Sequence, residues 1–124
     1  MAILSSIPVL NCHSIDETLA FYQQILQFVI VNKRENNNQL QWVHIMHGDI
    51  TMMLQRIEGK TSESRPDQKS SISIYFFVSN INDMHHYIKA KYNFVSELRN
   101  TDYHMQEFTV TDPEGNTVTV GQKS

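Results

Sequence analysis

The feature that most constrains this chain is an order of elements that occurs twice. Each half of the sequence has the pattern of a strand, a helix and three further strands. Two pairs of residues mark the repeat: Ile15 matches Ile81 (81 − 15 = 66), and Gly48 matches Gly115 (115 − 48 = 67). The match is faint residue by residue. It predicts two similar modules that pack against each other or against a second chain.

The repeat divides one predicted domain, residues 1–124, into two modules. We expect the first module at about 3–56, a connector at 57–71 and the second module at about 72–122. The connector is rich in Gly, Ser, Lys, Glu and Gln, a composition typical of an exposed segment between packed elements.

The first module begins with a predicted strand at 3–11. Ser14 follows, with Glu17 three residues later, which is the spacing of a capping box. We therefore expect a helix from Ser14 to near Phe28. Three strands complete the module, at 29–34, 40–46 and 50–55.

The second module repeats this order, beginning with a strand at 72–78. Asn80 is placed as the N-cap of a helix, and Asn93 as its left-handed exit. A strand at 94–98 follows, and a hairpin from Tyr103 to Val120 closes the chain.

The turn of this hairpin carries the clearest local signal. Pro113 presets the backbone of the second turn position, Asp112 can bond to the backbone ahead of it, and Gly115 accepts a left-handed conformation. Apolar residues alternate on both sides of the turn, which predicts a strand pair with one face in a core.

Charge and composition argue against several classes of function. The formal net charge is −3 and Lys and Arg do not cluster, so we expect no nucleic-acid partner. No apolar stretch is long enough to cross a bilayer, and residues 1–8 lack the features of a signal peptide. The single Cys12 cannot form an internal disulfide, so we expect a cytoplasmic location.

Strand alternation separates two faces of the predicted sheets. One face is nearly all apolar, and we expect it to pack under the helices. Its residues are Leu10, Val43, Ile45, Ile50, Met52, Leu54, Ile72, Ile74, Phe76, Val78, Phe108, Val110, Val118 and Val120. The opposite face comprises Ile7, Val9, Trp42, His44, Met46, Thr51, Met53, Gln55, Ser73, Tyr75, Tyr103, Met105, Glu107, Thr109 and Thr119.

The second face is too apolar for a surface that meets only solvent. It carries Trp42, Tyr75 and three methionines, Met46, Met53 and Met105. An apolar pocket with a few polar groups has this composition. A filled interior or a subunit interface has the same composition, so both interpretations stay open.

Two parts of the sequence together resemble a known superfamily. The motifs that carry the resemblance are Ile7-Pro8-Val9-Leu10, Ser14-Ile15-Asp16, Ala20-Phe21-Tyr22, Leu26-Gln27-Phe28 and the hairpin with Asp112-Pro113-Glu114-Gly115-Asn116. They make the chain similar to the vicinal-oxygen-chelate superfamily of glyoxalase I, extradiol dioxygenases, fosfomycin-resistance transferases and bleomycin-resistance proteins. The resemblance covers nearly the whole chain outside the connector. Gln27 departs from it, because relatives usually have Gly at this helix exit.

The resemblance implies an α+β fold of two paired βαβββ modules, in which curved mixed sheets enclose a cleft. Pairing in the superfamily is often between chains, so we expect a homodimer, although pairing within one chain stays open. In metal-dependent relatives four positions hold the ion. Here those positions are Ile7, Met53, Ser73 and Thr119, which are poor ligands for a divalent metal. We therefore expect neither a metal nor a cofactor.

Other candidates for chemistry are weaker. His44 and Glu107 share the cleft face, where they could form an unusual metal site or an acid–base pair. Cys12 is expected to be a buried small hydrophobe. Four further histidines are expected at the surface: His13, His47, His85 and His86.

Three functions fit these observations. The favoured one is a metal-free, dimeric binder of a small, partly aromatic molecule, most similar to the bleomycin-resistance type and without catalytic residues. Its ligand-binding residues are Trp42, His44, Met46, Met53, Tyr75, Tyr103, Met105 and Glu107. The second is a lyase- or dioxygenase-like enzyme with a displaced metal site or a His44/Glu107 acid–base pair. In the third, the aromatic face is only a subunit interface.

Overall fold

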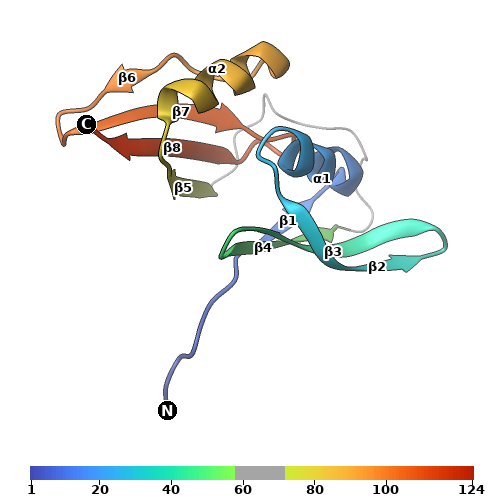
Figure 1. Cartoon of the computed structure of the whole chain (residues 1–124). Coiled ribbons are helices and arrows are strands. Elements are labelled where there is room, and N and C mark those ends of the chain that lie inside the picture. Colours follow the sequence, from blue (N-terminus) through green and yellow to red (C-terminus); the bar gives the residue numbers. More distant parts are fainter. Residues whose placement is uncertain (58–71) are drawn as a thin grey trace. The chain divides into compact units, whose positions relative to one another are not determined.

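The structure, a computed structural model, describes residues 1–57 and 72–124 (Figure 1). The chain forms two compact units, Met1–Ser64 and Arg65–Ser124, and each is described by itself. The boundary between them falls within the predicted connector. That connector lies outside the described residues except for Ile57, whose backbone N–H donates to the carbonyl of Cys12 at 2.9 Å.

Unit 1 is one helix on a four-stranded sheet. Its elements are β1 (Val9–Cys12), α1 (Ile15–Gln24), β2 (Val29–Asn36), β3 (Gln39–His47) and β4 (Ile50–Arg56). The strands lie in the order β1-β4-β3-β2. The β1–β4 pair is parallel and the other pairs are antiparallel, so the sheet is mixed.

Unit 2 repeats this topology. Its elements are β5 (Ser73–Phe77), α2 (Ile81–Lys91), β6 (Arg99–Asn100), β7 (Met105–Thr111) and β8 (Thr117–Lys123). The strands lie in the order β5-β8-β7-β6, and the β5–β8 pair is the parallel one. The predicted α+β fold of two βαβββ modules is therefore confirmed.

The register of the strands follows the same repeat. Val9 lies opposite Met53 in unit 1, and Tyr75 lies opposite Thr119 in unit 2. Both residues of the second pair stand 66 positions after their counterparts, since 75 − 9 = 66 and 119 − 53 = 66. A position in one sheet can therefore be compared directly with its counterpart in the other.

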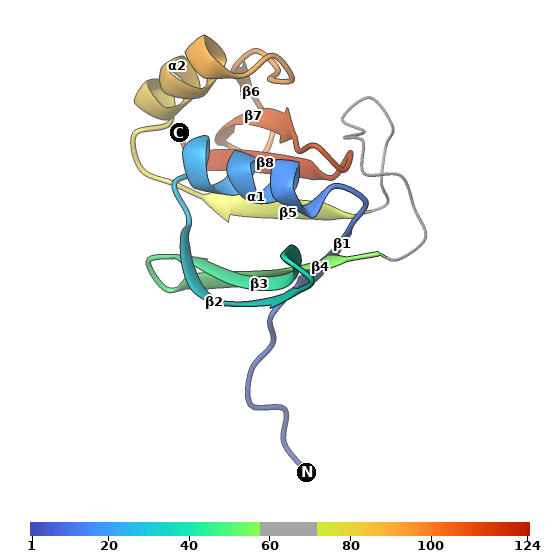
Figure 2. The same ribbon diagram turned by 90° about the vertical axis from the view of Figure 1, so that its right-hand side faces the viewer.

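Each helix covers one face of its own sheet (Figures 1 and 2). The sheet residues buried on these faces are Leu10, Val43, Ile45, Met52, Leu54, Phe108, Val110, Val118 and Val120, as predicted. Ile50 and Ile72 were wrongly assigned to the core: Ile50 begins β4, Ile72 precedes β5, and they are 42% and 44% exposed. The helices have 10 and 11 residues, and in the described residues none is long and apolar enough to cross a membrane.

Two predicted strands were wrong in their extent. β1 begins at Val9 rather than at residue 3, because its partner β4 pairs with it only from Met53 onwards. No regular strand forms at 94–98. Within that segment Val95 makes an isolated bridge to Val110, and the strand of this region is the two-residue β6.

The helix ends differ from the predicted motifs. Ser14 occupies the N-cap of α1 but its side chain makes no capping hydrogen bond, so the capping box does not form. α1 also ends at Gln24 rather than near Phe28. Beyond it, Gln27 has φ 61°, a left-handed conformation that Gly adopts without a steric cost.

In unit 2, Asn80 is the N-cap of α2, again without a side-chain capping bond. The Oε1 atom of Gln122 on β8 accepts from the Ile81 N–H instead, at 2.7 Å. The predicted left-handed exit at Asn93 is wrong, because α2 ends in the extended Tyr92, with φ −142°. A side chain from β8 therefore supplies the capping hydrogen bond that was expected from Asn80.

The turn between β7 and β8 matches its prediction. Gly115 has φ 86°, and Asp112 Oδ1 accepts from the backbone N–H groups of Glu114 and Asn116, each at 2.9 Å. The Asn116 side chain donates to Asp112 Oδ2 at 2.9 Å. Because Asp112 is fully buried, these bonds satisfy a carboxylate that would otherwise be costly to bury.

Candidate functional site

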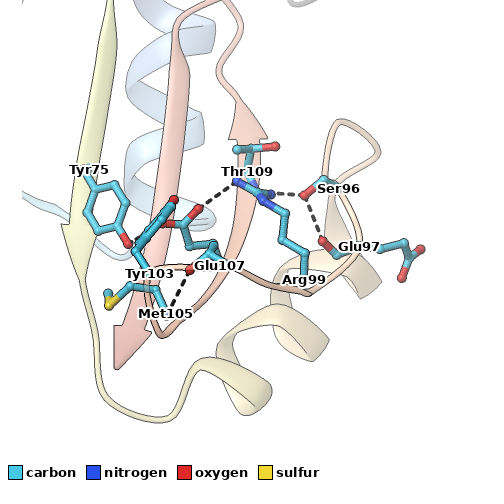
Figure 3. A network of polar contacts seen from close by, with 9 residues as sticks. Tyr75, Ser96, Glu97, Arg99, Tyr103, Met105, Glu107 and Thr109 are labelled. Atoms are coloured by element: carbon cyan, nitrogen blue, oxygen red, sulfur yellow. Dashed lines mark hydrogen bonds and ion pairs between the residues drawn. The ribbon is translucent and has the colours of Figure 1, made fainter. Parts of the chain in front are cut away.

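The face of the unit 2 sheet opposite α2 is built around Glu107 on β7 (Figure 3). Its carboxylate is only 2% exposed. Oε2 accepts from the hydroxyls of Tyr75 and Tyr103, both at 2.7 Å, and Oε1 accepts from the Arg99 guanidinium at 3.0 Å. Both carboxylate oxygens are thus engaged by side chains from β5, β6 and the turn before β7.

Tyr75 reaches Glu107 because the strand between them has no side chain at the crossing. β8 separates β5 from β7, and Gly121 on β8 lies opposite Glu107. A Cβ atom at Gly121 would lie 1.9 Å from the Tyr75 hydroxyl oxygen. Gly121 is therefore required here for close approach of a side chain rather than for backbone conformation.

This arrangement determines the charge state of the Glu107 carboxyl group and of the two phenol groups that donate to it. Burial raises the pKa of Glu107, but hydrogen bonds from Tyr103 and Tyr75 and the charge of Arg99 outweigh it and hold the pKa below its usual value. Partial burial and the bond to Glu107 raise the pKa of Tyr75 to about 12. The bond to Glu107 also raises the pKa of Tyr103. At neutral pH Glu107 is ionised and both phenols are neutral donors.

The aromatic rings beside this network remain accessible. Tyr75 is 38% exposed and Tyr103 58% exposed. Phe77, 77% exposed, lies with its ring centroid 4.8 Å from that of Tyr75. Met105, half-buried, begins β7. Sequence reasoning missed Phe77 and Arg99; the period-2 alternation that selected Tyr75 also selects Phe77.

In unit 1 the corresponding face carries the other four candidate residues. Trp42, His44 and Met46 alternate along β3, and Met53 on β4 lies opposite His44. All four are half-buried, while the intervening Val43 and Ile45 are fully buried under α1. The chain therefore holds large aromatic and thioether groups partly open to solvent on this sheet.

Two polar groups on this face have unused binding capacity. The Nε2 atom of His44 is buried without a hydrogen-bond partner, the one such side-chain atom within residues 1–57 and 72–124. The Arg34 guanidinium lies over the Trp42 ring, 5.6 Å from its centroid. Sequence reasoning missed Arg34, which could be found only through its pairing with Trp42 across β2 and β3.

The four positions that the family resemblance implies as metal ligands fall in both units. Ile7 and Met53 belong to unit 1, where the Met53 N–H donates to the carbonyl of Pro8, next to Ile7, at 2.9 Å. Ser73 and Thr119 lie on the paired strands β5 and β8. Across the described part of the chain, no group of three His, Cys, Asp or Glu residues is placed to hold a metal ion.

The eight candidate residues thus form two sets of four, one on each sheet, and a single cleft that joins the sets stays a prediction. Among the other candidates, Cys12 is buried as expected. His85 was wrongly expected at the surface: it is 9% exposed, packs on Phe108 and places Nε2 2.9 Å from the Ser96 carbonyl oxygen. It is a structural residue between α2 and its sheet.

Comparison with known families identifies the group to which this fold belongs. The family model of the Glyoxalase/Bleomycin resistance protein/Dioxygenase superfamily matches residues 6–120. The chain belongs to this superfamily. The resemblance inferred from the sequence motifs is therefore confirmed, and the chain is a glyoxalase/bleomycin-resistance-like protein.

Several solved structures share the superfamily fold with this chain. A bleomycin-binding protein from Streptomyces verticillus, complexed with copper(II)-bleomycin, is 18% identical with a TM-score of 0.68, and the match covers 100% of this chain and 99% of that one. A glyoxalase-related enzyme from Clostridium phytofermentans is 12% identical with a TM-score of 0.75, covering 100% and 98%. A virulence protein from Salmonella typhimurium is 24% identical with a TM-score of 0.69, covering 99% and 100%. No curated protein sequence matches the chain significantly.

Proposed function

We propose that this superfamily member is a metal-free, homodimeric protein that binds a small, planar, partly aromatic molecule. The observation that carries the proposal is the half-open set of aromatic and methionine side chains on the sheet face opposite the helix in both units. The binding residues we propose are Trp42, His44, Met46, Met53, Tyr75, Tyr103, Met105 and Glu107. Glu107 acts in this set by holding Tyr75 and Tyr103 in place.

Comparison with relatives supports a binding role. Solved structures with this fold include bleomycin-binding proteins complexed with bleomycin and with copper(II)-bleomycin. Aromatic rings provide large contact areas for planar ligands, and methionines adapt to irregular ones. The expected absence of metal is supported by residue chemistry, since Ile7, Met53, Ser73 and Thr119 offer no strong metal ligand.

The enzymatic alternative has less support. A general acid at Glu107 would need a carboxyl that holds a proton near neutral pH. The hydrogen bonds from Tyr103 and Tyr75 act in the opposite direction, because they stabilise the carboxylate. Both oxygens of Glu107 are also occupied by side chains of the protein.

A thermal-shift screen with planar aromatic compounds tests the proposal. Bound compounds should raise the melting temperature by at least about 2 °C and change the fluorescence of Trp42, the single tryptophan. Trp42→Ala should abolish the shift, whereas Tyr87→Ala on α2, outside both faces, should retain it. If no compound shifts either signal, the aromatic faces serve only as an interface.

Metal content and mass separate the remaining possibilities. Protein purified without chelator should contain no stoichiometric divalent ion by elemental analysis, and light scattering should give twice the 14.4 kDa chain mass. A bound ion that is lost in His44→Ala would favour the enzymatic alternative. We also infer a cytoplasmic location from the single buried Cys12, which cell fractionation tests.

A further inference from the structure

The ligand-facing chemistry of unit 1 is concentrated around Trp42. Arg34 on β2 lies opposite Trp42 in the sheet register, with its guanidinium carbon 5.6 Å from the centre of the indole ring. Two residues further along β3, the ring of His44 lies 6.4 Å from the indole, centre to centre. The indole is therefore flanked by a permanent cation and by an imidazole.

The Arg34 guanidinium and the His44 Nε2 atom can each form further polar contacts. Within residues 1–57 and 72–124 the Arg34 guanidinium has no ion pair and contacts the Trp42 ring. His44 Nε2 is shielded from water and has no hydrogen-bond partner. A buried polar atom without a partner is costly, so a bound molecule that supplies one gains affinity at that point, provided that the His44 side chain shifts to expose Nε2.

No carboxylate among the cross-strand partners offsets this cation. The residues opposite Trp42 and His44 in the neighbouring strands are Arg34, Gln55, Asn32 and Met53. Glu35, the next residue along β2, is 3.8 Å from Lys33, which lies opposite the fully buried Val43 and hence on the helix-covered face. In unit 2, the charge of Glu107 is already matched by Arg99.

From this geometry we propose that the ligand is an aromatic acid with a second polar group at its far end. Its ring packs on Trp42, its anionic group pairs with Arg34, and the second group forms a hydrogen bond with His44 Nε2. A planar, charge-assisted pair between guanidinium and carboxylate is a strong polar contact, and Arg favours it over Lys. This assignment rests on the proposed binding function and specifies the class of ligand.

Four probes that share one ring system test the assignment by calorimetry: 6-hydroxy-2-naphthoate, its amide, 6-hydroxy-2-naphthylmethylammonium and 2-naphthoate. The hydroxy acid should bind the full chain about fivefold or more tighter than its amide, and the ammonium should bind most weakly. Loss of the hydroxyl in 2-naphthoate should weaken binding about threefold or more.

Three variants assign these differences to residues. Arg34→Gln should remove the preference for acid over amide. Lys33→Gln removes the same charge from the same strand on the opposite face, so it should retain the preference. His44→Phe keeps the ring but removes Nε2, so it should equalise the hydroxy acid and 2-naphthoate while leaving the chain folded by circular dichroism.

The outcomes distinguish this inference from the proposal on which it rests. Equal binding of acid and amide, tighter binding of the ammonium, or an equal effect of Lys33→Gln and Arg34→Gln would overturn the aromatic-acid assignment and leave a planar-ligand binder. Failure of all four probes, together with no hit in the planar-compound screen, would overturn both.

Discussion

The two sheets of this protein share one backbone plan but treat their polar groups in opposite ways. In unit 2, Glu107 is buried and accepts bonds from two tyrosines and an arginine. In unit 1, His44 Nε2 is buried without a partner among residues 1–57 and 72–124, and the Arg34 guanidinium lies over the Trp42 ring. The buried carboxylate of unit 2 is thus satisfied within its own sheet, whereas the buried imidazole nitrogen of unit 1 is not.

The difference arises at a few equivalent positions. Gly121 is the counterpart of Gln55 (121 − 55 = 66), and Glu107 is the counterpart of Trp42 (107 − 42 = 65). Gln55 bonds to Asn11 on the neighbouring strand at 3.1 Å. Gly121 instead leaves an opening through which Tyr75 reaches Glu107. One missing side chain thus allows contacts across three strands.

Removing the charge of Glu107 should give the largest effect on this contrast. Glu107→Gln keeps the shape but replaces charged hydrogen bonds with neutral ones and leaves Arg99 unpaired. We expect the free energy of unfolding to fall by about 2–3 kcal/mol, the lower end because Arg99 is partly solvated. Urea denaturation measures it. As a control, Glu97→Gln removes an exposed partner of Lys89 and should cost less than about 0.5 kcal/mol. Equal losses in the two variants would show that the bonds from Tyr75, Tyr103 and Arg99 to Glu107 add no more stability than a surface ion pair.

The same network predicts a dependence on acid. The folded-state pKa of Glu107 is below the unfolded value, so its contribution to stability is present above the unfolded pKa and is lost as pH falls through the folded pKa. The stability difference between the wild type and Glu107→Gln should therefore be full at pH 7 and shrink below about pH 4. Denaturation at pH 7, 5 and 3 measures this difference. A difference that stayed constant over this range would show that the carboxylate charge adds no stability.

Closing the opening at Gly121 should have a smaller effect. In Gly121→Ala the new Cβ displaces the Tyr75 hydroxyl, and loss of that bond should lower stability by about 1 kcal/mol. The cost should shrink when Tyr75 is already Phe, because the closest contact, the hydroxyl oxygen at 1.9 Å, is then gone, although the ring carbon Cζ would still lie 2.6 Å from the new Cβ. A double-mutant cycle over Gly121→Ala and Tyr75→Phe measures this coupling. Additive effects would mean that the Tyr75 hydroxyl does not account for the cost of a side chain at Gly121.

In unit 1, removing the buried His44 nitrogen that lacks a partner should change stability in the opposite direction. His44→Phe removes a buried nitrogen that lacks a partner, so stability should rise by up to about 1 kcal/mol. His47→Phe is the matched control on the same strand, since His47 Nδ1 lies 3.1 Å from the Leu26 carbonyl oxygen and its loss should destabilise. Thermal denaturation compares the two, and a loss of stability in both would show that His44 is satisfied in solution.

How far these features could be predicted depends on the range of the interactions. The β7–β8 turn was predictable because Asp112, Pro113 and Gly115 act on neighbours within a few residues. The repeated topology was predictable because hydrophobic period and element order survive faint sequence similarity. Alternation alone also placed Trp42 and His44 on the face opposite the buried core residues.

The remaining features depend on register, which no short segment determines. Apolar residues at 94–98 favoured a strand, yet the regular pairing begins only at Arg99, opposite Glu107. The hydrogen bonds to Glu107 come from side chains in three other segments, and they also require that position 121 has no side chain. The position of Arg34 beside Trp42 likewise could not be predicted without the register of β2 and β3.

A final prediction concerns backbone strain at equivalent helix exits. Gln27 has φ 61°, where a side chain costs free energy that Gly avoids, so Gln27→Gly should stabilise unit 1 by about 0.5–1 kcal/mol. Its counterpart Asn93 (93 − 27 = 66) follows an extended residue and has no positive φ. Asn93→Gly should therefore only add freedom to the unfolded chain and lower stability slightly. Chemical denaturation of both variants tests whether the repeat differs in backbone as well as in polar groups; equal shifts of the same sign would mean that it does not.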